Sequence, residues 1–251
     1  MTTLRIVQLY PDLLGVTGDR GNVDVLAARA RFAGLDVDVA AVGIGDPSPE
    51  VAHVVVIGNG PLSAMRAVRD DLAGRREWLH VQRDAGAAVL AVGGGAELLT
   101  DGVDLLDGGR VDGLGLVPAR VARTRRRRVG YVVADTSDGR LVGFEDHASE
   151  WTLTDAADGG IRYGKVIAGD GSVAGGTETL VVDGLYATNV QGPVLPLNPQ
   201  LADAILRRAA AAAGVDYVVG VEHQGVDRHA AAARAEIERL AESKHFTAIQ
   251  L

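Results

Sequence analysis

The chain has 251 residues, 47% of them hydrophobic, and a formal net charge of -8. This size and composition suit one large α/β domain, and the negative charge disfavours nucleic acid and anionic lipid surfaces as main partners because the protein's field repels phosphate. The sequence contains no cysteine, which excludes a disulfide framework, a thiolate metal site and a thiol nucleophile.

Nothing in the sequence resembles a membrane or export signal. No apolar run is long enough to span a bilayer, and the first residues lead directly into a strand pattern without the regions of a signal peptide. We therefore expect a cytoplasmic protein without membrane insertion, and we find no motif that calls for a metal or a cofactor.

The first 100 residues alternate between strand-like and helix-like segments. Short apolar, β-branched runs predict buried strands at residues 4–9, 36–41, 53–57 and 87–92. Helical spacing of apolar residues predicts helices at 22–32 and about 62–84, and a short helix at 96–99 after the glycines at 93–95. This alternation predicts a parallel sheet covered by helices on both faces, with ligands at the carboxyl ends of its strands.

The remainder of the chain changes character. Short β-like runs at 129–134, 140–144, 161–167 and 177–182 predict an antiparallel addition to the same sheet within residues 101–183. Helices are expected at 199–213 and 228–242. We interpret 1–251 as one domain, with 214–251 as its C-terminal helical extension, and the basic run at 125–128 as a solvated loop or strand edge.

Three segments, in matching order and spacing, carry a family resemblance. They are YPDLLGVTGDRGNVDVLAAR at 10–29, GFEDH at 143–147 and QGPVLPLNP at 191–199. With them the chain resembles the class I glutamine amidotransferases of the cobyric acid synthase (CobB/CobQ) type, above all the glutaminase subunits of lipid II isoglutaminyl synthase. The resemblance extends to about residue 212. It implies a flavodoxin-like three-layer sandwich with a largely parallel central sheet and an antiparallel addition.

The resemblance also implies that the glutaminase dyad is missing. In the family, a cysteine at the strand-to-helix elbow attacks the glutamine side chain, and here that position is Gly93, which offers no nucleophile. The family's histidine precedes Gly-Pro, and here that position is Gln191. A carboxamide has no useful proton affinity near neutral pH. Loss of both partners indicates disuse of the dyad.

Other site positions follow from the same resemblance. The family's oxyanion loop corresponds to Gly58, Asn59 and Gly60, but Pro61 follows and has no amide hydrogen to donate. With Gly94, which follows the elbow position, these residues would bind the substrate if the site is retained. The family's substrate-binding arginine precedes an Ile-Gly or Val-Gly pair, so either Arg127 or Arg128 would clamp a glutamine carboxylate if an amino-acid site remains.

The remaining motif residues have structural explanations. In GFEDH, we expect Glu145 and His147 to support a loop near the site, although a repurposed site would use His147 with Glu145 or Glu97. In the loop after the first strand, an aspartate such as Asp19 would cap the next helix, and Arg20 would bridge loops.

These features favour a catalytically degenerate, amidotransferase-like subunit. Such a pseudo-glutaminase would form a heterodimer with a Mur-ligase-like (MurT-type) ATP-dependent amide synthase, in cell-wall (lipid II, peptidoglycan) or natural-product amidation. The amine donor would be free ammonia, glutamine or another small amine. The alternative is a repurposed enzyme whose emptied cleft binds or transforms another small molecule. A third, least favoured hypothesis moves the nucleophile to Ser63 or Thr100.

Overall fold

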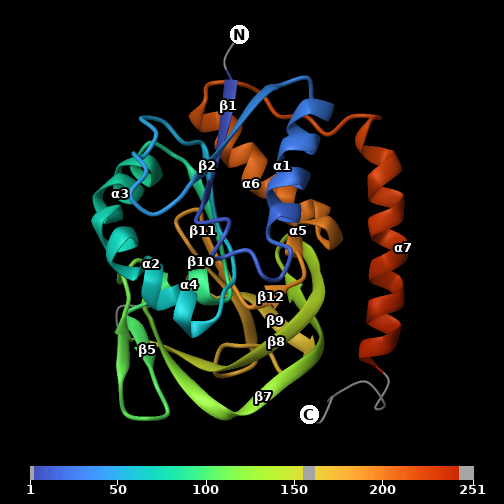
Figure 1. The fold of residues 1–251 in the computed structure, drawn as a ribbon. Coiled ribbons are helices and arrows are strands. Elements are labelled where there is room, and N and C mark those ends of the chain that lie inside the picture. Colours follow the sequence, from blue (N-terminus) through green and yellow to red (C-terminus); the bar gives the residue numbers. More distant parts are fainter. Residues whose placement is uncertain (1–2, 155–161, 243–251) are drawn as a thin grey trace.

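The computed structural model describes residues 3–154 and 162–242 as a mixed α/β fold (Figure 1). The helices are α1 (Arg20–Phe32), α2 (Leu62–Gly74), α3 (Arg76–Asp84), α4 (Gly94–Leu99), α5 (Val194–Leu197), α6 (Pro199–Ala212) and α7 (His223–Ala241). The strands are β1 (Thr3–Leu9), β2 (Asp36–Val42), β3 (Val54–Ile57), β4 (Ala88–Val92), β5 (Gly102–Asp104), β6 (Arg110–Asp112), β7 (Ala119–Thr136), β8 (Gly139–Leu153), β9 (Arg162–Ala168), β10 (Thr177–Val182), β11 (Leu185–Thr188) and β12 (Val190–Gln191).

The strands of the described residues form one sheet with the order β12-β8-β7-β9-β10-β11-β4-β3-β1-β2, and β5 and β6 branch from β7. The section from β11 through β4, β3 and β1 to β2 is parallel. Five pairs are antiparallel: β7 with β8, β7 with β9, β9 with β10, β10 with β11, and β8 with β12. The predicted parallel sheet with an antiparallel addition is therefore confirmed.

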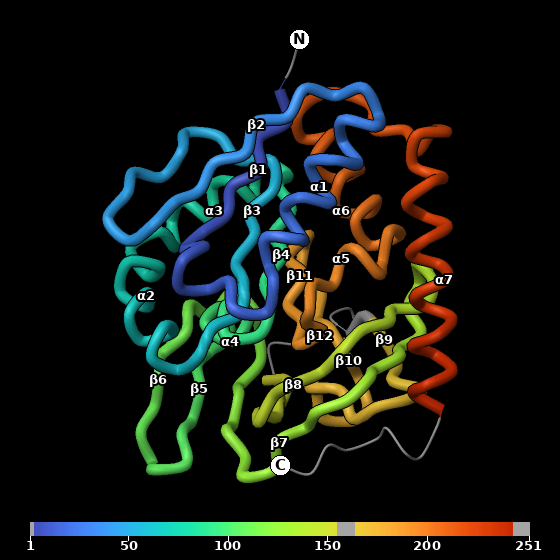
Figure 2. Tube along the Cα trace, turned by 45° about the vertical axis from the view of Figure 1, so that its right-hand side comes forward, coloured from blue at the N-terminus to red at the C-terminus, as the bar shows by residue number. Residues whose placement is uncertain are grey.

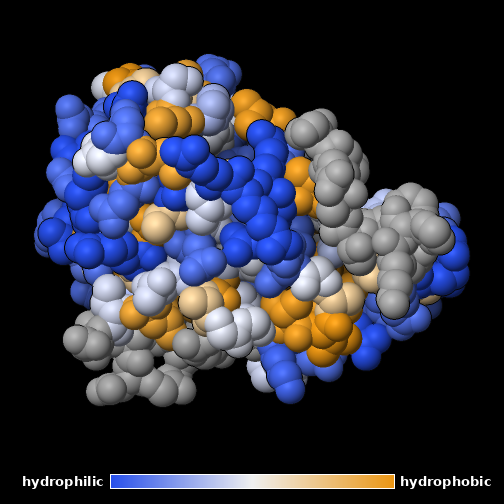
Figure 3. Space-filling view, turned by 90° about the horizontal axis from the view of Figure 1, so that it is seen from below, coloured by the Kyte–Doolittle hydropathy of each residue, from blue (hydrophilic) through white to orange (hydrophobic). Residues whose placement is uncertain are grey.

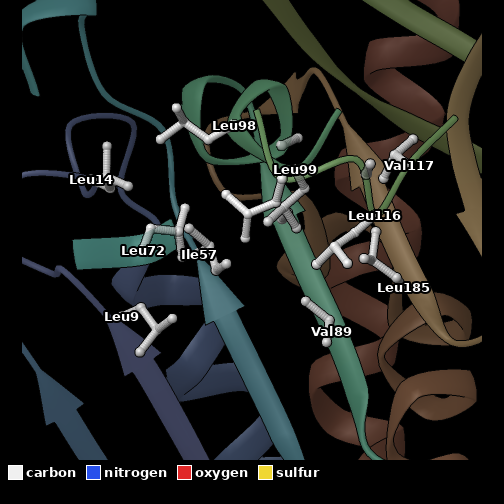
Figure 4. Packing of buried hydrophobic residues seen from close by; sticks show 14 of the residues in the cluster. Leu9, Leu14, Ile57, Leu72, Val89, Leu98, Leu99, Leu116, Val117 and Leu185 are labelled. Carbon is white, nitrogen blue, oxygen red and sulfur yellow. The ribbon is translucent and has the colours of Figure 1, made fainter. Parts of the chain in front are cut away.

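Helices cover both faces of the parallel section. One apolar cluster joins Leu9, Ile57 and Val89 of the sheet to residues of α2, α3 and α4 (Figure 4). A second cluster, on the other face, joins Leu4, Val56 and neighbouring strand residues to α1, α5 and α6. Every residue of β3 and β4 is buried, which explains why these strands are continuous apolar runs in the sequence. The three layers predicted from the sequence are present.

The single helix predicted at 62–84 is wrong: two helices, α2 and α3, meet at Arg75. The Arg75 side chain is 6% exposed and donates to the carboxylate of Asp71 at 2.7 Å. It also donates to the carbonyl oxygens of Gly43 and Asp46, at 3.0 and 2.8 Å. Gly74, a poor helix former, stands just before the break. Contacts with a distant loop therefore decide where the helix ends.

The antiparallel addition is larger than predicted. β7 and β8 have 18 and 15 residues, whereas the sequence indicated only 129–134 and 140–144. The basic run at 125–128 lies inside β7, where the pairing register with β8 shifts between Arg123 and Arg128. The strand predicted at 161–167 is β9, although residue 161 lies outside the described residues. The predicted strands were too short because polar residues interrupt the apolar alternation by which strands are recognised: arginines in β7, and the acidic and polar residues from Glu145 to Glu150 in β8.

β7 and β8 lie beneath the parallel strands in two views (Figures 1 and 2). Seen from below, the molecule is mostly hydrophilic with separate apolar patches (Figure 3). Arg125, Arg126 and Arg127 of β7 are exposed. The side of the molecule seen from below is therefore mostly polar.

The helix α7 begins at His223, earlier than the predicted 228, and stands along one side of the molecule (Figure 1). At its start, Arg29 of α1 donates to Asp227 at 2.6 Å and, with two further hydrogen bonds, to Asp203 of α6. At its other end, Ile237 and Ala241 pack near Val133 and Val142 of β7 and β8. Both ends of α7 are therefore attached to the body. Within the described part of the chain, no helix is sufficiently long and apolar to cross a bilayer.

Candidate functional site

A cleft of about 530 Å³ lies at the carboxyl ends of β3 and β4. Its walls come from the loops after β1, β3 and β4 together with β7, β8 and β12. The lining residues are Val16, Thr17, Asn59, Gly60, Pro61, Leu62, Gly93, Gly94, Glu97, Arg123, Arg127, Asp146, His147, Ala148, Asn189 and Gln191. The volume lies within the range of about 300–1,000 Å³ that is typical of small-molecule sites.

The elbow between β4 and α4 requires glycine. Gly93 has φ 53° and ψ -121°, a left-handed conformation that L side chains rarely adopt. A Cβ atom on Gly94 would lie 2.6 Å from the carbonyl oxygen of Gly60, and one on Gly95 would lie 2.5 Å from that of Gly58. The elbow and the loop after β3 therefore pack backbone against backbone.

The side chain of Asn59 occupies the space above the elbow. A Cβ atom on Gly93 would overlap the Asn59 carboxamide and would lie only 2.9 Å from the Asn59 Cβ atom. Asn59 Oδ1 accepts a hydrogen bond from the Gly94 amide at 2.8 Å, and Nδ2 donates to Gln191 Oε1 at 3.3 Å. Gln191 Nε2 in turn donates to the carbonyl oxygen of Asp146 at 3.2 Å. We call the paired Asn59 and Gln191 side chains the amide latch.

The amide latch occupies the groups that an elbow of this kind would use for catalysis. Gly93 carries no side chain that could attack a substrate. The Gly94 amide is the donor that an elbow offers to a developing oxyanion, and here it is already bonded to Asn59. The residues that the resemblance aligns with the dyad and the oxyanion loop thus lie together, but they satisfy one another.

Asp19 supports this arrangement through its hydrogen bonds and does not act as the predicted helix cap. It precedes α1 but its side chain makes no capping hydrogen bond. Instead Oδ2 accepts from the backbone amide of Asn59 at 3.1 Å and from the hydroxyl of Thr17 at 3.0 Å. Burial raises the pKa of Asp19, and these hydrogen bonds partly oppose the shift. Arg20 pairs with Asp24 one helical turn away and does not bridge loops.

The two candidate arginines point to different places. Arg127 lines the cleft and forms two hydrogen bonds with Asp146, at 2.5 and 2.9 Å, with its side chain 57% exposed. Arg128 lies outside the cleft lining and donates to the carbonyl oxygen of Ser149 and to Glu150, at 2.8 and 3.2 Å. Of these two arginines only Arg127 therefore reaches the cleft, and its guanidinium is largely occupied.

Of Glu145 and His147, likewise, only one lines the cleft. The Glu145 carboxylate accepts from the backbone amides of Asp170 and Gly171, at 2.7 and 2.9 Å, and so holds that loop. His147 lines the cleft, with Nδ1 3.1 Å from the carbonyl oxygen of Ser149 and Nε2 3.4 Å from Glu145. Glu145 is engaged in structure, whereas the imidazole faces the cleft.

Sequence reasoning missed Arg123 and Asn189, which both line the cleft. Arg123 Nη2 donates to Glu97 Oε2 at 2.5 Å. Burial raises the pKa of the Glu97 carboxyl, and the charge of Arg123 counteracts this shift. A signal for Asn189 was present, because a residue two positions before Gln191 shares its face in an extended chain. Arg123 stands four residues before Arg127, a spacing that would place both on one face of a regular strand. The register of β7 shifts between Arg123 and Arg128, so this spacing gave no clear prediction.

The proposed replacement nucleophiles are not at the cleft. Neither Ser63 nor Thr100 is among the lining residues, and Thr100 Oγ1 donates to the carbonyl oxygen of Glu97 at 2.7 Å. Among the described residues, no group of three or more histidine, aspartate or glutamate side chains is placed to hold a metal ion.

A parallel sheet that ends in a strand-to-helix elbow, with a cleft bordered by an antiparallel extension, defines a protein of the glutamine amidotransferase fold class. Residues 5–195 match the model of the CobB/CobQ-like glutamine amidotransferase domain, and the chain belongs to this family. The resemblance seen in the sequence is thereby confirmed.

Two curated relatives have similar sequences along most of their length. Subunit GatD of the glutamine-hydrolyzing lipid II isoglutaminyl synthase from Streptococcus pneumoniae is 29% identical over 217 residues, which cover 82% of this chain and 80% of the relative. The GatD subunit from Staphylococcus aureus is 23% identical over 219 residues, with coverage of 86% and 88%. The chain is thus GatD-like in sequence.

Solved structures agree on the fold. A chain of PurLQS from Thermotoga maritima has a TM-score of 0.52 at 10% identity, covering 91% of this chain and 99% of its own length. The glutaminase domain of CTPS from Trypanosoma brucei, solved with acivicin, has a TM-score of 0.52 at 15% identity, with coverage of 86% and 96%. At these identities the likeness concerns the fold alone.

Proposed function

We propose that this chain is the amidotransferase-type subunit of an ATP-dependent amide synthase and that it does not hydrolyse glutamine. Its relatives are named as subunits of lipid II isoglutaminyl synthase, which supports a role in amidating lipid II or a related carboxylate. The partner in this proposal is a Mur-ligase-like subunit that activates the carboxylate with ATP.

One observation supports the proposed loss of glutaminase activity. The position where a nucleophilic side chain would stand on residue 93 is filled by the carboxamide of Asn59, which also occupies the amide hydrogen of Gly94. Covalent glutamine hydrolysis needs a nucleophile, a base and an open oxyanion site together. In this cleft the nucleophile and base positions hold Gly93 and Gln191, and the oxyanion donor is engaged.

The proposal is tested with the purified chain and with its complex with a Mur-ligase-like subunit from the same organism. We expect no ammonia release from glutamine by either preparation, and amide synthesis by the complex with ammonium as the nitrogen source. The chain should raise the yield or stability of the ligase in this assay. Amide synthesis that depends on glutamine as nitrogen donor would sink the proposal.

A second candidate function is a repurposed cleft that binds or transforms another small molecule. The favouring observation is that the cleft remains open at about 530 Å³ although its elbow is blocked. His147 and Glu97 would supply acid/base groups, because Glu145 is committed to the loop at Asp170 and Gly171. Turnover of a cleft ligand that is lost when His147 is replaced by Gln would favour this function.

A further inference from the structure

The central sheet ends on one side at a strand with an open edge. β2 is the last strand in the sheet order and pairs with β1 along all of its 7 residues. Within residues 3–154 and 162–242, no strand pairs with its other side. In Figure 1, β1 and β2 lie between α3 and α1, which belong to the two outer layers. The far side of β2 is therefore a row of backbone groups directed away from the sheet.

Alternate residues of β2 direct their backbone groups to this open edge. The carbonyl oxygen of Val42 accepts from the amide of Tyr10 at 2.7 Å, so the even-numbered residues of β2 face β1. The amides and carbonyls of Val37, Val39 and Ala41 point the other way. Among the described residues, no backbone hydrogen bond outside the ladder with β1 involves these groups. Three amides and three carbonyls are thus available to an added strand.

β2 has few of the features that block pairing at a sheet edge. It contains no proline, and its register with β1 is regular, without a bulge. Val37 and Val39 are half-buried and pack against the apolar cluster beneath α1. Ala41 is exposed, and the charged side chains of the strand are Asp36 and Asp38 alone. The strand therefore presents a straight edge with an apolar side and an acidic side.

The acidic side indicates the charge of the occupant. Asp38 forms an exposed pair with Arg5 at 3.0 Å, whereas Asp36 has no ion pair within the described part of the chain. In a two-fold pairing with a second copy, the aspartates of both chains would share one short ladder, and like charges across strands are destabilising. A strand with basic residues at alternate positions sets opposite charges against both aspartates. The net charge of -8 favours the same partner.

We propose that the open edge of β2 binds an extended segment of a partner protein that carries basic residues at alternate positions. The segment runs antiparallel and forms backbone hydrogen bonds with Val37, Val39 and Ala41. Its basic side chains lie opposite Asp36 and Asp38, and its apolar side chains extend the face of the two valines. The inference goes beyond the proposed function and does not depend on the cleft.

The test is a titration of the whole chain with a fluorescent probe peptide, Thr-Val-Thr-Val-Lys-Val-Lys with blocked ends, followed by anisotropy. In the antiparallel register that sets the lysines opposite Asp36 and Asp38, the valine amides face β2 and the lysine amides face away. N-methylation of the last two valines should weaken binding by about tenfold or more, because two backbone hydrogen bonds are lost. The matched peptide, N-methylated on both lysines, should bind as the probe does. Absence of probe binding, or equal losses with both methylated peptides, overturns the proposal.

Variants of the chain locate the site. Val39→Pro removes one outward amide and places its ring on the edge, but leaves the ladder with β1 intact because residue 39 does not donate to β1. Probe binding should be lost, whereas Val39→Thr, which keeps the amide, should bind normally. Asp36→Asn with Asp38→Asn should weaken binding by about tenfold. The matched control is Asp84→Asn, an exposed acid on α3. Unchanged affinity in the double variant contradicts the proposal, and this result stands even if the proline variant does not fold.

Two further measurements identify the edge and the occupant. Hydrogen exchange should show new protection of the amides of Val37, Val39 and Ala41 when the probe binds, and little change at Asp38 and Ala40, which already face β1. Protection confined to other segments overturns the site. Sedimentation of the chain alone tests a second copy: a dimer that Val39→Pro dissociates overturns the choice of a basic partner. None of these experiments needs glutamine or a ligase, so their outcome is separate from that of the proposed function.

Discussion

Asn59 Nδ2 donates a 3.3 Å hydrogen bond to Oε1 of Gln191, and this contact joins the loop after β3 to the strand β12. Through Oδ1, the same Asn59 carboxamide accepts from the amide of Gly94. Three segments far apart in the sequence therefore meet through one carboxamide. A place that the family resemblance assigns to chemistry is held together here by neutral hydrogen bonds.

The amide latch is expected to contribute to stability as a unit. Asn59→Ala and Gln191→Leu should each lower the free energy of unfolding by about 1 kcal/mol, the usual net worth of such a hydrogen bond. In a double-mutant cycle followed by urea denaturation, the double variant should lose less stability than the sum of the two single variants, because the first change already removes the hydrogen bond between the two side chains. Strictly additive effects would show that the two carboxamides do not interact.

Restoring a thiol at the elbow should first meet a steric obstacle. Gly93→Cys alone places a Cβ atom against the Asn59 side chain at a left-handed φ, so we expect it to lower the free energy of unfolding by about 1–3 kcal/mol, as overpacking does. Adding Asn59→Gly should recover part of this loss, measured by thermal denaturation.

The companion change Asn59→Ala separates sterics from hydrogen bonding in the cysteine variant. It should recover less, since the Asn59 Cβ atom itself lies 2.9 Å from the added Cβ. Because the chain has no cysteine of its own, alkylation with iodoacetamide reports only the new thiol. Equal recovery with Ala and Gly would contradict the predicted contact.

Asp19 should make stability fall as pH rises. Burial raises its pKa above the ordinary 3.8, so the folded chain keeps this proton to a higher pH than the unfolded chain does. Its contribution is thus fully favourable below pH 3.8 and is lost as pH rises through the raised value. Urea denaturation at a series of pH values should show Asp19→Asn gaining stability relative to the unaltered chain over this window. The exposed Asp12 on the same loop supplies the control Asp12→Asn, which should show no such trend.

The attachment of α7 should depend on Arg29. This arginine is 3% exposed and bridges Asp203 and Asp227, so Arg29→Met removes the cation beside the buried carboxylate of Asp203 and leaves it the hydrogen bond from the Tyr217 hydroxyl. We expect a loss of about 3–5 kcal/mol in unfolding free energy, as when one partner of a buried pair is removed. Limited proteolysis should also cleave residues 214–222 more rapidly. Arg31→Met on the exposed side of the same helix should change neither quantity.

The sequence by itself determined the layered α/β architecture and the absence of a thiol. Continuous apolar runs such as those of β3 and β4 identify buried parallel strands because both of their faces are covered. The three glycines at 93–95 marked the elbow because its backbone contacts leave no room for side chains. Each of these features is a property of one short segment, which is why sequence patterns revealed it.

Only the tertiary structure decided which side chains share the cleft and which are already paired. Asn59 fills the elbow through contacts with residues 35 and 132 positions away, and Arg123 enters the cleft because the pairing of β7 with β8 shifts beyond it. Arg75 likewise divides a helix by binding a loop about 30 residues earlier. Such contacts depend on how whole elements pack in space, and local spacing in the sequence carries no record of that packing.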